Sequence, residues 1–237
     1  MIRVRRADDR GQMTNDWLQA RYSFSFGEYR DSNHMSYGPL RVMNEDVVKP
    51  GGGFPMHGHA NFEIVTYVID GCLEHKDSMG NSGVIRAGDV QYMRAGKGVK
   101  HSEFNPLKEQ ETHLLQIWFK AKEKDVDPLY DIRKASDVND GEPLDLLLSA
   151  DGRKGSMQIN QDVCFYKGRL EADEEIDFRP DKDRVQWVQI IKGGVTINDV
   201  SILAGDGAAI ENEETFRILA KEPTTFLLFD MKPNQNT

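Results

Sequence analysis

Two short pairs of metal-binding side chains, far apart in the chain, are the part of this sequence best suited to chemistry. His57 and His59 are separated by one residue, and so are His101 and Glu103. Side chains two positions apart on a β-strand point to the same face, so each pair would present both members to one side. If the two strands are neighbours, three imidazoles and a carboxylate converge, which suits a metal site with room left for substrate or oxygen. The competing interpretation is four unrelated polar side chains on solvated strands.

The segments around these pairs alternate between apolar runs and turn residues. Residues 64–69 are rich in β-branched and aromatic side chains, which is typical of a buried strand. Glycine, aspartate, asparagine and serine cluster where the chain should reverse. The pattern predicts strands over residues 64–69, 72–77 and 90–93, with turns at 70–71, 77–83 and 95–98.

The two pairs lie in segments that resemble the two signature motifs of the cupin superfamily. The first motif, G-x5-H-x-H-x3-E, runs from Gly51 to Glu63, and the second, G-x2-H-x3-N, runs from Gly98 to Asn105. Glu63 matches the usual carboxylate ligand of cupins, whereas Glu103 is an additional carboxylate. That addition resembles the ligand pattern of one cupin family, the pirins. Further resemblance to pirins is found in residues 22–26, 66–68, 75–81 and 95–103.

The second half of the chain repeats features of the first. Residues 189–193 resemble residues 67–71, and residues 203–206 resemble residues 86–89. Together with the family resemblance, the repeat predicts an all-β bicupin: two β-barrels of the double-stranded β-helix or jelly-roll type, with few short helices. We expect the metal-binding barrel in residues 1–135 and a cupin-like barrel without metal ligands in residues 136–237.

The ligand candidates themselves are not repeated. All six histidines lie at or before His113. The second barrel is therefore expected to be structural or to bind a partner. Counting from the matched glycines, the positions that correspond to the four ligand candidates are Arg179, Asp181, Ile218 and Ala220.

Composition excludes several classes of protein. The formal net charge of −9 over 237 residues argues against a duplex-DNA surface, which needs clustered Lys and Arg. No apolar run reaches the roughly 18 residues of a membrane helix, and the start of the chain lacks a signal-peptide core. Cys72 and Cys164 lie in different halves and do not form a disulfide framework. We predict a cytoplasmic monomer that binds neither nucleic acid nor membrane, with an early strand at residues 3–6 and a loose tail at 232–237.

The identity of the metal and the activity follow from the resemblance rather than from the donors. Imidazole binds iron, nickel, copper and zinc alike. The resemblance to pirins implies Fe(II), with Ni, Cu, Zn, Mn and Co as alternatives, and it implies that O2 opens a flavonol such as quercetin with release of carbon monoxide. Glu103 is the candidate catalytic base for the flavonol proton, because a carboxylate that can leave the metal serves as ligand and base in turn. The implied ligands are His57, His59, His101 and Glu103.

Other residues are candidates for supporting roles. Glu63 is expected either to orient a ligand histidine or to be a satisfied acid beside the barrel. Opposite strand parity predicts that only one of His113 and Gln116 faces the site. His34 and His75 are expected on the surface or in loops. The candidate walls of an apolar substrate pocket, each with barrel core as its alternative, are Phe24, Phe26, Phe54, Met56, Tyr92 and Phe104.

A second class of function stays open at this point. Some pirins are described as cofactors of transcription factors or as modulators of a metabolic enzyme. The resemblance therefore also implies a regulatory protein that binds a protein partner, with the metal as a redox or structural switch and little or no turnover. A cupin that binds a sugar or a small acid without turnover is a third alternative.

Overall fold

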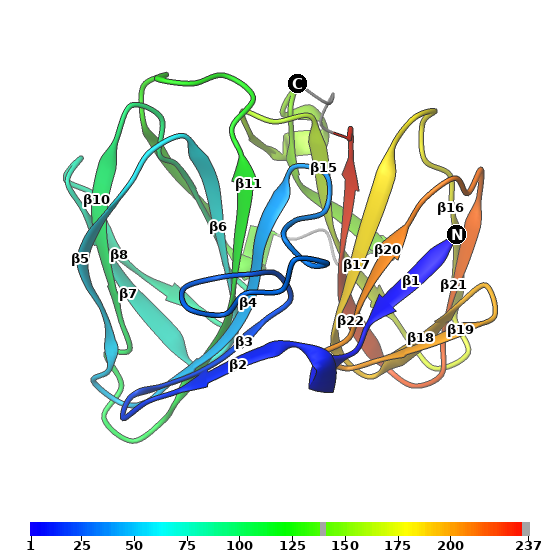
Figure 1. The fold of residues 1–237 in the computed structure, drawn as a ribbon, viewed down its shortest axis with the longest axis horizontal. Coiled ribbons are helices and arrows are strands. Elements are labelled where there is room, and N and C mark those ends of the chain that lie inside the picture. Colours follow the sequence, from blue (N-terminus) through cyan, green and yellow to red (C-terminus); the bar gives the residue numbers. More distant parts are fainter. Residues whose placement is uncertain (138–140, 234–237) are drawn as a thin grey trace.

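Two β domains lie side by side in the computed structural model, which describes residues 1–137 and 141–233 (Figure 1). The prediction of an all-β chain with two similar domains is confirmed. Helical structure in the described ranges is limited to the 3₁₀ turns η1 (Ala7–Asp9), η2 (Ala135–Asp137) and η3 (Arg153–Gly155), and none of these could span a membrane. The expectation of a loose tail concerns mainly residues 234–237, which lie outside the described residues.

The N-terminal domain carries the candidate ligands and consists of two antiparallel sheets that face each other. The small sheet has the order β5 (Gly53–His59), β10 (Val99–Phe104), β7 (Cys72–Asp77) and β8 (Ser82–Arg86). The large sheet has the order β12 (Leu129–Arg133), β9 (Val90–Arg94), β6 (Phe62–Asp70), β11 (Thr112–Lys120), β4 (Leu40–Val48), β3 (Leu18–Tyr22) and β2 (Gly11–Thr14). The strands predicted over 64–69, 72–77 and 90–93 are therefore confirmed as β6, β7 and β9.

The C-terminal domain repeats this arrangement. Its small sheet has the order β16 (Glu175–Phe178), β21 (Phe216–Ala220), β18 (Gly194–Ile197) and β19 (Val200–Leu203). Its large sheet has the order β1 (Ile2–Arg5), β20 (Gly207–Ile210), β17 (Val185–Lys192), β22 (Thr224–Met231), β15 (Val163–Leu170), β13 (Leu144–Ser149) and β14 (Met157–Gln158). The strand order thus places β16 and β21 where the first domain has β5 and β10.

The first strand crosses from one domain to the other. β1 pairs with β20, and Ile2 lies opposite Ile210. Ile2 and Val4 pack on the apolar interior of the C-terminal domain, which explains why an apolar residue interrupts the basic run at residues 3–6. The predicted strand is present, but it extends the second domain rather than the first. The boundary near residue 135 itself stays a prediction.

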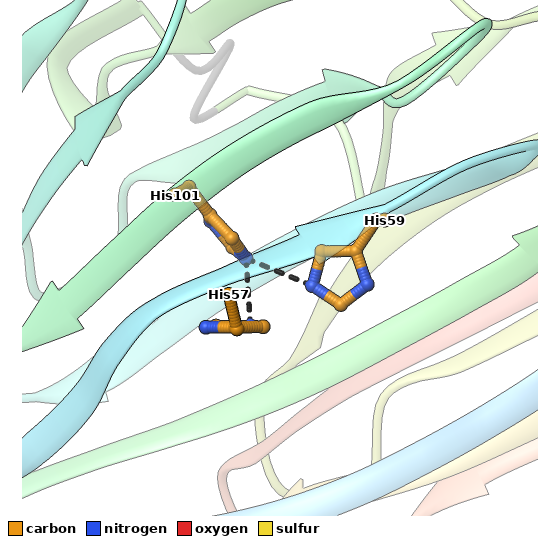
Figure 2. A group of neighbouring side chains, drawn as sticks. All are labelled: His57, His59 and His101. Carbon is orange, nitrogen blue, oxygen red and sulfur yellow. Dashed lines mark hydrogen bonds between the residues drawn. The ribbon is translucent and has the colours of Figure 1, made fainter.

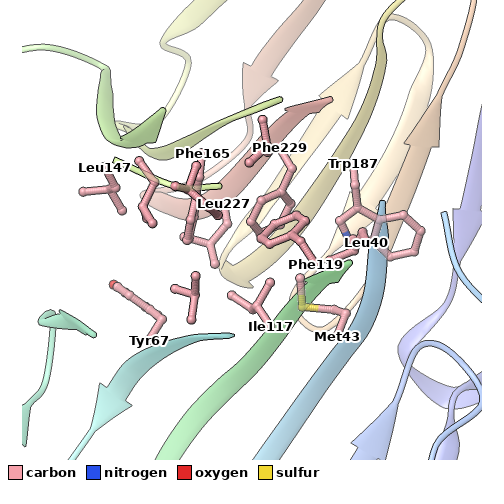
Figure 3. Packing of buried hydrophobic residues seen from close by; sticks show 14 of the residues in the cluster. Leu40, Met43, Tyr67, Ile117, Phe119, Leu147, Phe165, Trp187, Leu227 and Phe229 are labelled. Carbon is pink, nitrogen blue, oxygen red and sulfur yellow. The ribbon is translucent and has the colours of Figure 1, made fainter. Parts of the chain in front are cut away.

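The two large sheets pack face to face and form a large apolar core between the domains (Figure 3). The ring of Phe229 lies 5.6 Å from that of Phe119, across the interface, and 4.6 Å from that of Phe165. Central strands such as β6 are therefore buried on both faces, one against the domain interior and one against the other domain. Burial on both faces explains why residues 64–69 read as a continuous apolar run.

A glycine turn positions the strand that carries His101. Gly96 has a φ of +49°, in the left-handed region that favours glycine. A β-carbon at this position would lie 2.1 Å from the carbonyl oxygen of Val126. Only glycine fits both the backbone conformation and the close approach, so the turn predicted at 95–98 leads into β10 as the sequence indicated.

Candidate metal centre

The two predicted pairs lie on adjacent strands and point to the same interior. In the small sheet, β5 pairs with β10, and His57 lies directly opposite His101. Along β10 the side chains alternate, so His101 and Glu103 are buried while Lys100 and Phe104 are exposed. A β-bulge shifts the register between His101 and Glu103. In each pair the two side chains therefore point to the same face of their strand, as the spacing in the sequence predicts.

Three imidazole nitrogens converge at one point (Figure 2). His101 Nε2 lies 3.0 Å from His59 Nε2 and 3.1 Å from His57 Nε2. Two nitrogens that are each about 2.1 Å from one ion, at right angles, are separated by roughly 3 Å. The observed spacing therefore fits nitrogens that share a single cation.

The protonation of these imidazoles suits metal binding. His57 Nδ1 lies 2.8 Å from the carbonyl oxygen of Pro55, to which it donates its proton, and this leaves the lone pair on Nε2. Burial, together with the neighbouring imidazoles of His101 and His57, lowers the pKa of His59 to about 4. Burial and the imidazoles of His57 and His75 likewise lower the pKa of His101 to about 3. The nitrogens of His59 and His101 are therefore unprotonated at neutral pH.

Glu103 lies on the inner side of the three histidines and is only 3% exposed. Gln116 Nε2 donates to both of its carboxylate oxygens, at 3.0 and 2.8 Å, and Thr66 Oγ1 donates at 3.3 Å. The possible ligand atoms fall into two groups that share His101: one with His57 and His59, the other with His75 and Glu103. The structure therefore gathers the three predicted histidines, with Glu103 beside His101 in a second, adjoining group.

His75 is a residue whose place the sequence analysis predicted wrongly. It was expected on the surface or in a loop, but it is fully buried on β7, opposite Glu103 on β10. Its Nε2 lies 3.2 Å from an oxygen of Asp77, and its ring stacks on Tyr130 at 4.9 Å. The signal was present in the sequence, since residue 75 falls within the predicted strand over 72–77. His34, in contrast, lies in a loop, as expected.

Facing these ligands, the large sheet carries a row of polar residues across its interior face. Cross-strand pairing aligns them on five neighbouring strands. All are buried, and the carboxylate of Glu103 is held by two of them. This row, called the polar row below, consists of Tyr22, Asn44, Gln116, Thr66 and Gln91. Of these residues, the sequence alone indicated only Gln116 as one that could face the site. The others are far apart in the chain and are aligned only by the register of the strands.

The parity prediction for β11 is confirmed. Gln116 faces the site, whereas His113 points to the opposite face and its Nε2 lies 2.9 Å from Glu45. Glu63 is a satisfied acid at the domain interface: it accepts a hydrogen bond from the Tyr92 hydroxyl and another from Asn160 at 3.5 Å. No contact in the described residues links the Glu63 side chain to a ligand histidine, so the orienting role is wrong.

The candidate wall residues fall into three groups: some line a cavity, some belong to the apolar core and some lie on the surface. Phe26 and Phe54 line a cavity beside the histidines, and the ring of Phe54 lies 6.4 Å from that of His57. Phe24 and Tyr92 belong to the core between the domains. Met56 and Phe104 are 55% and 37% exposed, because they alternate with the inward-facing ligands on β5 and β10.

The C-terminal domain has apolar side chains where the N-terminal domain has the candidate ligands. Ile218 lies opposite Ile176 in the pair β21–β16, as His101 lies opposite His57 in β10–β5. The position predicted for Ile218 therefore matches, whereas Arg179 and Asp181 follow the end of β16 instead of lying opposite β21. The ungapped count slipped because the connection between β16 and β17, residues 179–184, is longer than the connection between β5 and β6, residues 60–61.

Comparisons with known proteins agree along the whole chain. Residues 3–119 match the Pirin family, and residues 146–231 match the quercetinase C-terminal cupin domain. The chain is 41% identical to an Escherichia coli K12 protein named quercetin 2,3-dioxygenase, over 98% of this chain and 100% of that protein. It is 34% identical to the pirin-like protein YhaK of the same organism, over 98% and 99% of the two chains.

The comparison with solved structures extends this likeness to three dimensions. The crystal structure of the bacterial pirin YhhW from Escherichia coli in complex with nickel(II) superposes with a TM-score of 0.94 at 40% identity. The match covers 98% of this chain and 100% of that one. The predicted bicupin architecture is therefore confirmed.

Proposed function

This chain belongs to the pirin family of the cupin superfamily, and from that premise we propose that it is a metal-dependent dioxygenase that opens flavonols such as quercetin with O2 and releases carbon monoxide. The observation that carries the proposal is the convergence of three imidazole nitrogens beside an aromatic-walled cavity. The name of the 41% identical relative supports the choice of substrate.

The metal would be held by His57, His59 and His101, with Glu103 as the fourth ligand after a change of its side-chain orientation. Three nitrogens and one oxygen leave positions free on an octahedral ion. We propose Fe(II) as the ion, while Ni, Cu, Zn, Mn and Co also fit these donors, and a similar pirin was crystallised with nickel(II). A bound ion would supply Lewis acidity toward the enolic oxygen of the flavonol and a route for electrons to O2.

The side chains at and around the proposed metal would accept the proton of the substrate and exclude water from it. Glu103 is the proposed base that accepts the proton of the flavonol hydroxyl at a carboxylate oxygen. Gln116 and Thr66 hold that carboxylate in place through their hydrogen bonds. Phe26 and Phe54 would exclude water from the flat substrate.

The test is oxygen uptake with quercetin on protein of known metal content, before and after removal of the metal and reconstitution with Fe(II). We expect uptake that depends on the metal, release of carbon monoxide, and loss of both in His57→Ala. His34→Ala is the matched control, because His34 lies in a loop outside both ligand groups. Metal-filled protein that neither consumes oxygen nor releases carbon monoxide would contradict the proposal.

That negative result would favour the alternative, a metal-dependent regulatory protein with a protein partner. One observation supports this alternative: Met56 and Phe104 expose apolar surface on the outer face of the two ligand-bearing strands. A partner bound there would contact the strands that hold the metal. Its signature would be an affinity that changes with the redox state of the ion and falls in Phe104→Ser.

A further inference from the structure

A cavity of about 450 Å³ opens beside the candidate metal centre, within the N-terminal domain. Its volume lies within the range of roughly 300–1,000 Å³ that is typical of small-molecule sites. Much of the wall is aromatic, with Tyr22, Phe26 and Phe54 among its residues. A wall of this kind suits a flat, largely apolar ring.

Among the polar side chains of that wall, one amide and one carboxyl are buried. Asn44 and Asp46 lie two positions apart on β4, both line the cavity, and both are 3% exposed. The buried Oδ1 atom of each has no hydrogen-bond partner among the described residues. Because both side chains line the cavity, a partner for these oxygens is supplied by what fills it, either water or a ligand.

Two other buried aspartates of the molecule are paired with arginines. Asp145 is paired with Arg133 at 3.0 Å, and Asp230 is bound by Arg184 and by Gln186. No cation of the described residues forms an ion pair with Asp46, and burial raises its pKa to about 8, with the charge of Glu103 as the next cause. At neutral pH the carboxyl is therefore largely uncharged, and it favours a neutral hydrogen-bonding group over a cation.

We propose that this cavity takes the hydroxylated ring of a flat phenolic ligand, and that Asp46 with Asn44 recognises the ring hydroxyls. This inference rests on the proposed function, because it assumes that the ligand's other end lies at the metal. The aromatic wall contacts the faces of the ring, while the hydroxyl groups donate to the Oδ1 atoms that have no partner among residues 1–137 and 141–233. Asp46 and Asn44 are thus specificity-determining residues, distinct from the metal ligands.

The experiment compares three flavonols that differ only in the hydroxyls of the pendant ring: quercetin with two, kaempferol with one and galangin with none. Dissociation constants are measured without oxygen on metal-loaded protein, so that no turnover is needed. We expect quercetin to bind more tightly than galangin by about five- to tenfold for each hydrogen bond formed. In Asp46→Leu this preference should disappear, whereas Asp46→Asn, which mimics the uncharged carboxyl, should keep most of it.

Two further variants keep the test decisive. Glu45→Gln changes the neighbouring acid, which points to the opposite face of β4, and should leave the order of affinities unchanged. If Asp46→Leu fails to fold, Asn44→Leu removes an acceptor from the same wall and should weaken the preference. Equal affinity for the three flavonols, no binding of any of them, or an unchanged preference in both leucine variants overturns the inference. Turnover without preference rejects the inference alone, and preference without turnover rejects the proposed function alone.

Discussion

The two domains have the same strand order but different interiors. The C-terminal domain fills its interior with aliphatic and aromatic side chains, including Ile218, Val188 and Leu228. In the N-terminal domain the matching strands carry the three candidate ligand histidines, Glu103 and the polar row. The interior also holds buried atoms without a partner, in His75, His101, Asn44, Asp46 and Gln91.

This difference shows what a binding site costs within one fold. An interior lined with unpaired polar groups loses apolar burial and leaves hydrogen bonds unmade. The C-terminal domain, in contrast, has a packed apolar interior and supplies one half of the core between the domains. The second domain can thus be understood as a support that stabilises a first domain whose interior serves ligands rather than stability.

Substitutions at matching positions of the two domains should give the largest difference in effect. His101→Ala removes the imidazole common to both ligand groups, so we expect loss of bound metal and of all metal-dependent activity. Ile218→Ala at the matching position should retain metal but lose about 2–5 kcal/mol of stability through the cavity it leaves. Metal analysis after dialysis and urea unfolding of both variants check this. A loss of metal in Ile218→Ala of the same size as in His101→Ala would contradict the comparison.

The core between the domains should couple their stabilities. Phe229 packs against Phe165 of its own domain and Phe119 of the other. Phe229→Ala should lower the free energy of unfolding by about 3–5 kcal/mol and affect both domains in one transition. If the other tryptophans are replaced in each case, fluorescence of Trp118 would report on the first domain, and fluorescence of Trp187 would report on the C-terminal side of the core between the domains. Two separate unfolding transitions, with only that of the C-terminal domain shifted, would show that the core does not couple the stabilities of the two domains.

The polar row should affect the metal affinity, whereas a buried glutamine of the other domain should affect stability alone. Gln116→Leu leaves the Glu103 carboxylate without its two hydrogen bonds from the amide, and loss of such an outer contact lowers metal affinity by roughly 10–100-fold. Gln186→Leu, which removes a buried hydrogen bond to Asp230 at 2.8 Å, should lower stability and leave metal affinity unchanged. Competition with a chelator of known affinity measures both. Unchanged metal affinity in Gln116→Leu would mean that Glu103 is not a ligand or is positioned without Gln116.

The sequence predicted those parts of the site that depend on short-range periodicity. The pairs His57–His59 and His101–Glu103 point inward because alternate residues on a strand share a face. The repeat predicted two domains, and the absence of histidine after residue 113 predicted a second domain without imidazole ligands. These conclusions required only neighbouring residues or their types.

What the sequence could not show depends on which strands become neighbours. The polar row joins residues from five strands through register. His75 faces the site because β7 pairs with β10, and the Oδ1 atom of Asp46 has no hydrogen-bond partner because none of the described residues on the neighbouring strands donates to it. The same limit applies to β1, whose pairing with β20 joins the two ends of the chain. Such long-range pairings are set by tertiary packing, which local patterns do not encode.

The smallest expected effect concerns the seam between the domains. Arg10 donates to Glu45 of the first domain at 2.8 Å and to the carbonyl oxygen of Gly205 in the second at 2.7 Å. Burial alone would raise the pKa of Glu45, but the hydrogen bond from His113 and the charge of Arg10 outweigh it and lower the pKa to about 2.

Because the pKa of Glu45 is lower in the folded state, its contribution to stability is complete above the unfolded value of about 4.3 and is lost as the pH falls toward 2. We expect the free energy of unfolding of the wild type to fall by about 1–2 kcal/mol more than that of Glu45→Gln between pH 6 and pH 2.5. Urea unfolding at several pH values measures the difference. Parallel pH profiles for the two proteins would show that the carboxylate adds nothing to the seam, and that the domains are held together by the apolar core alone.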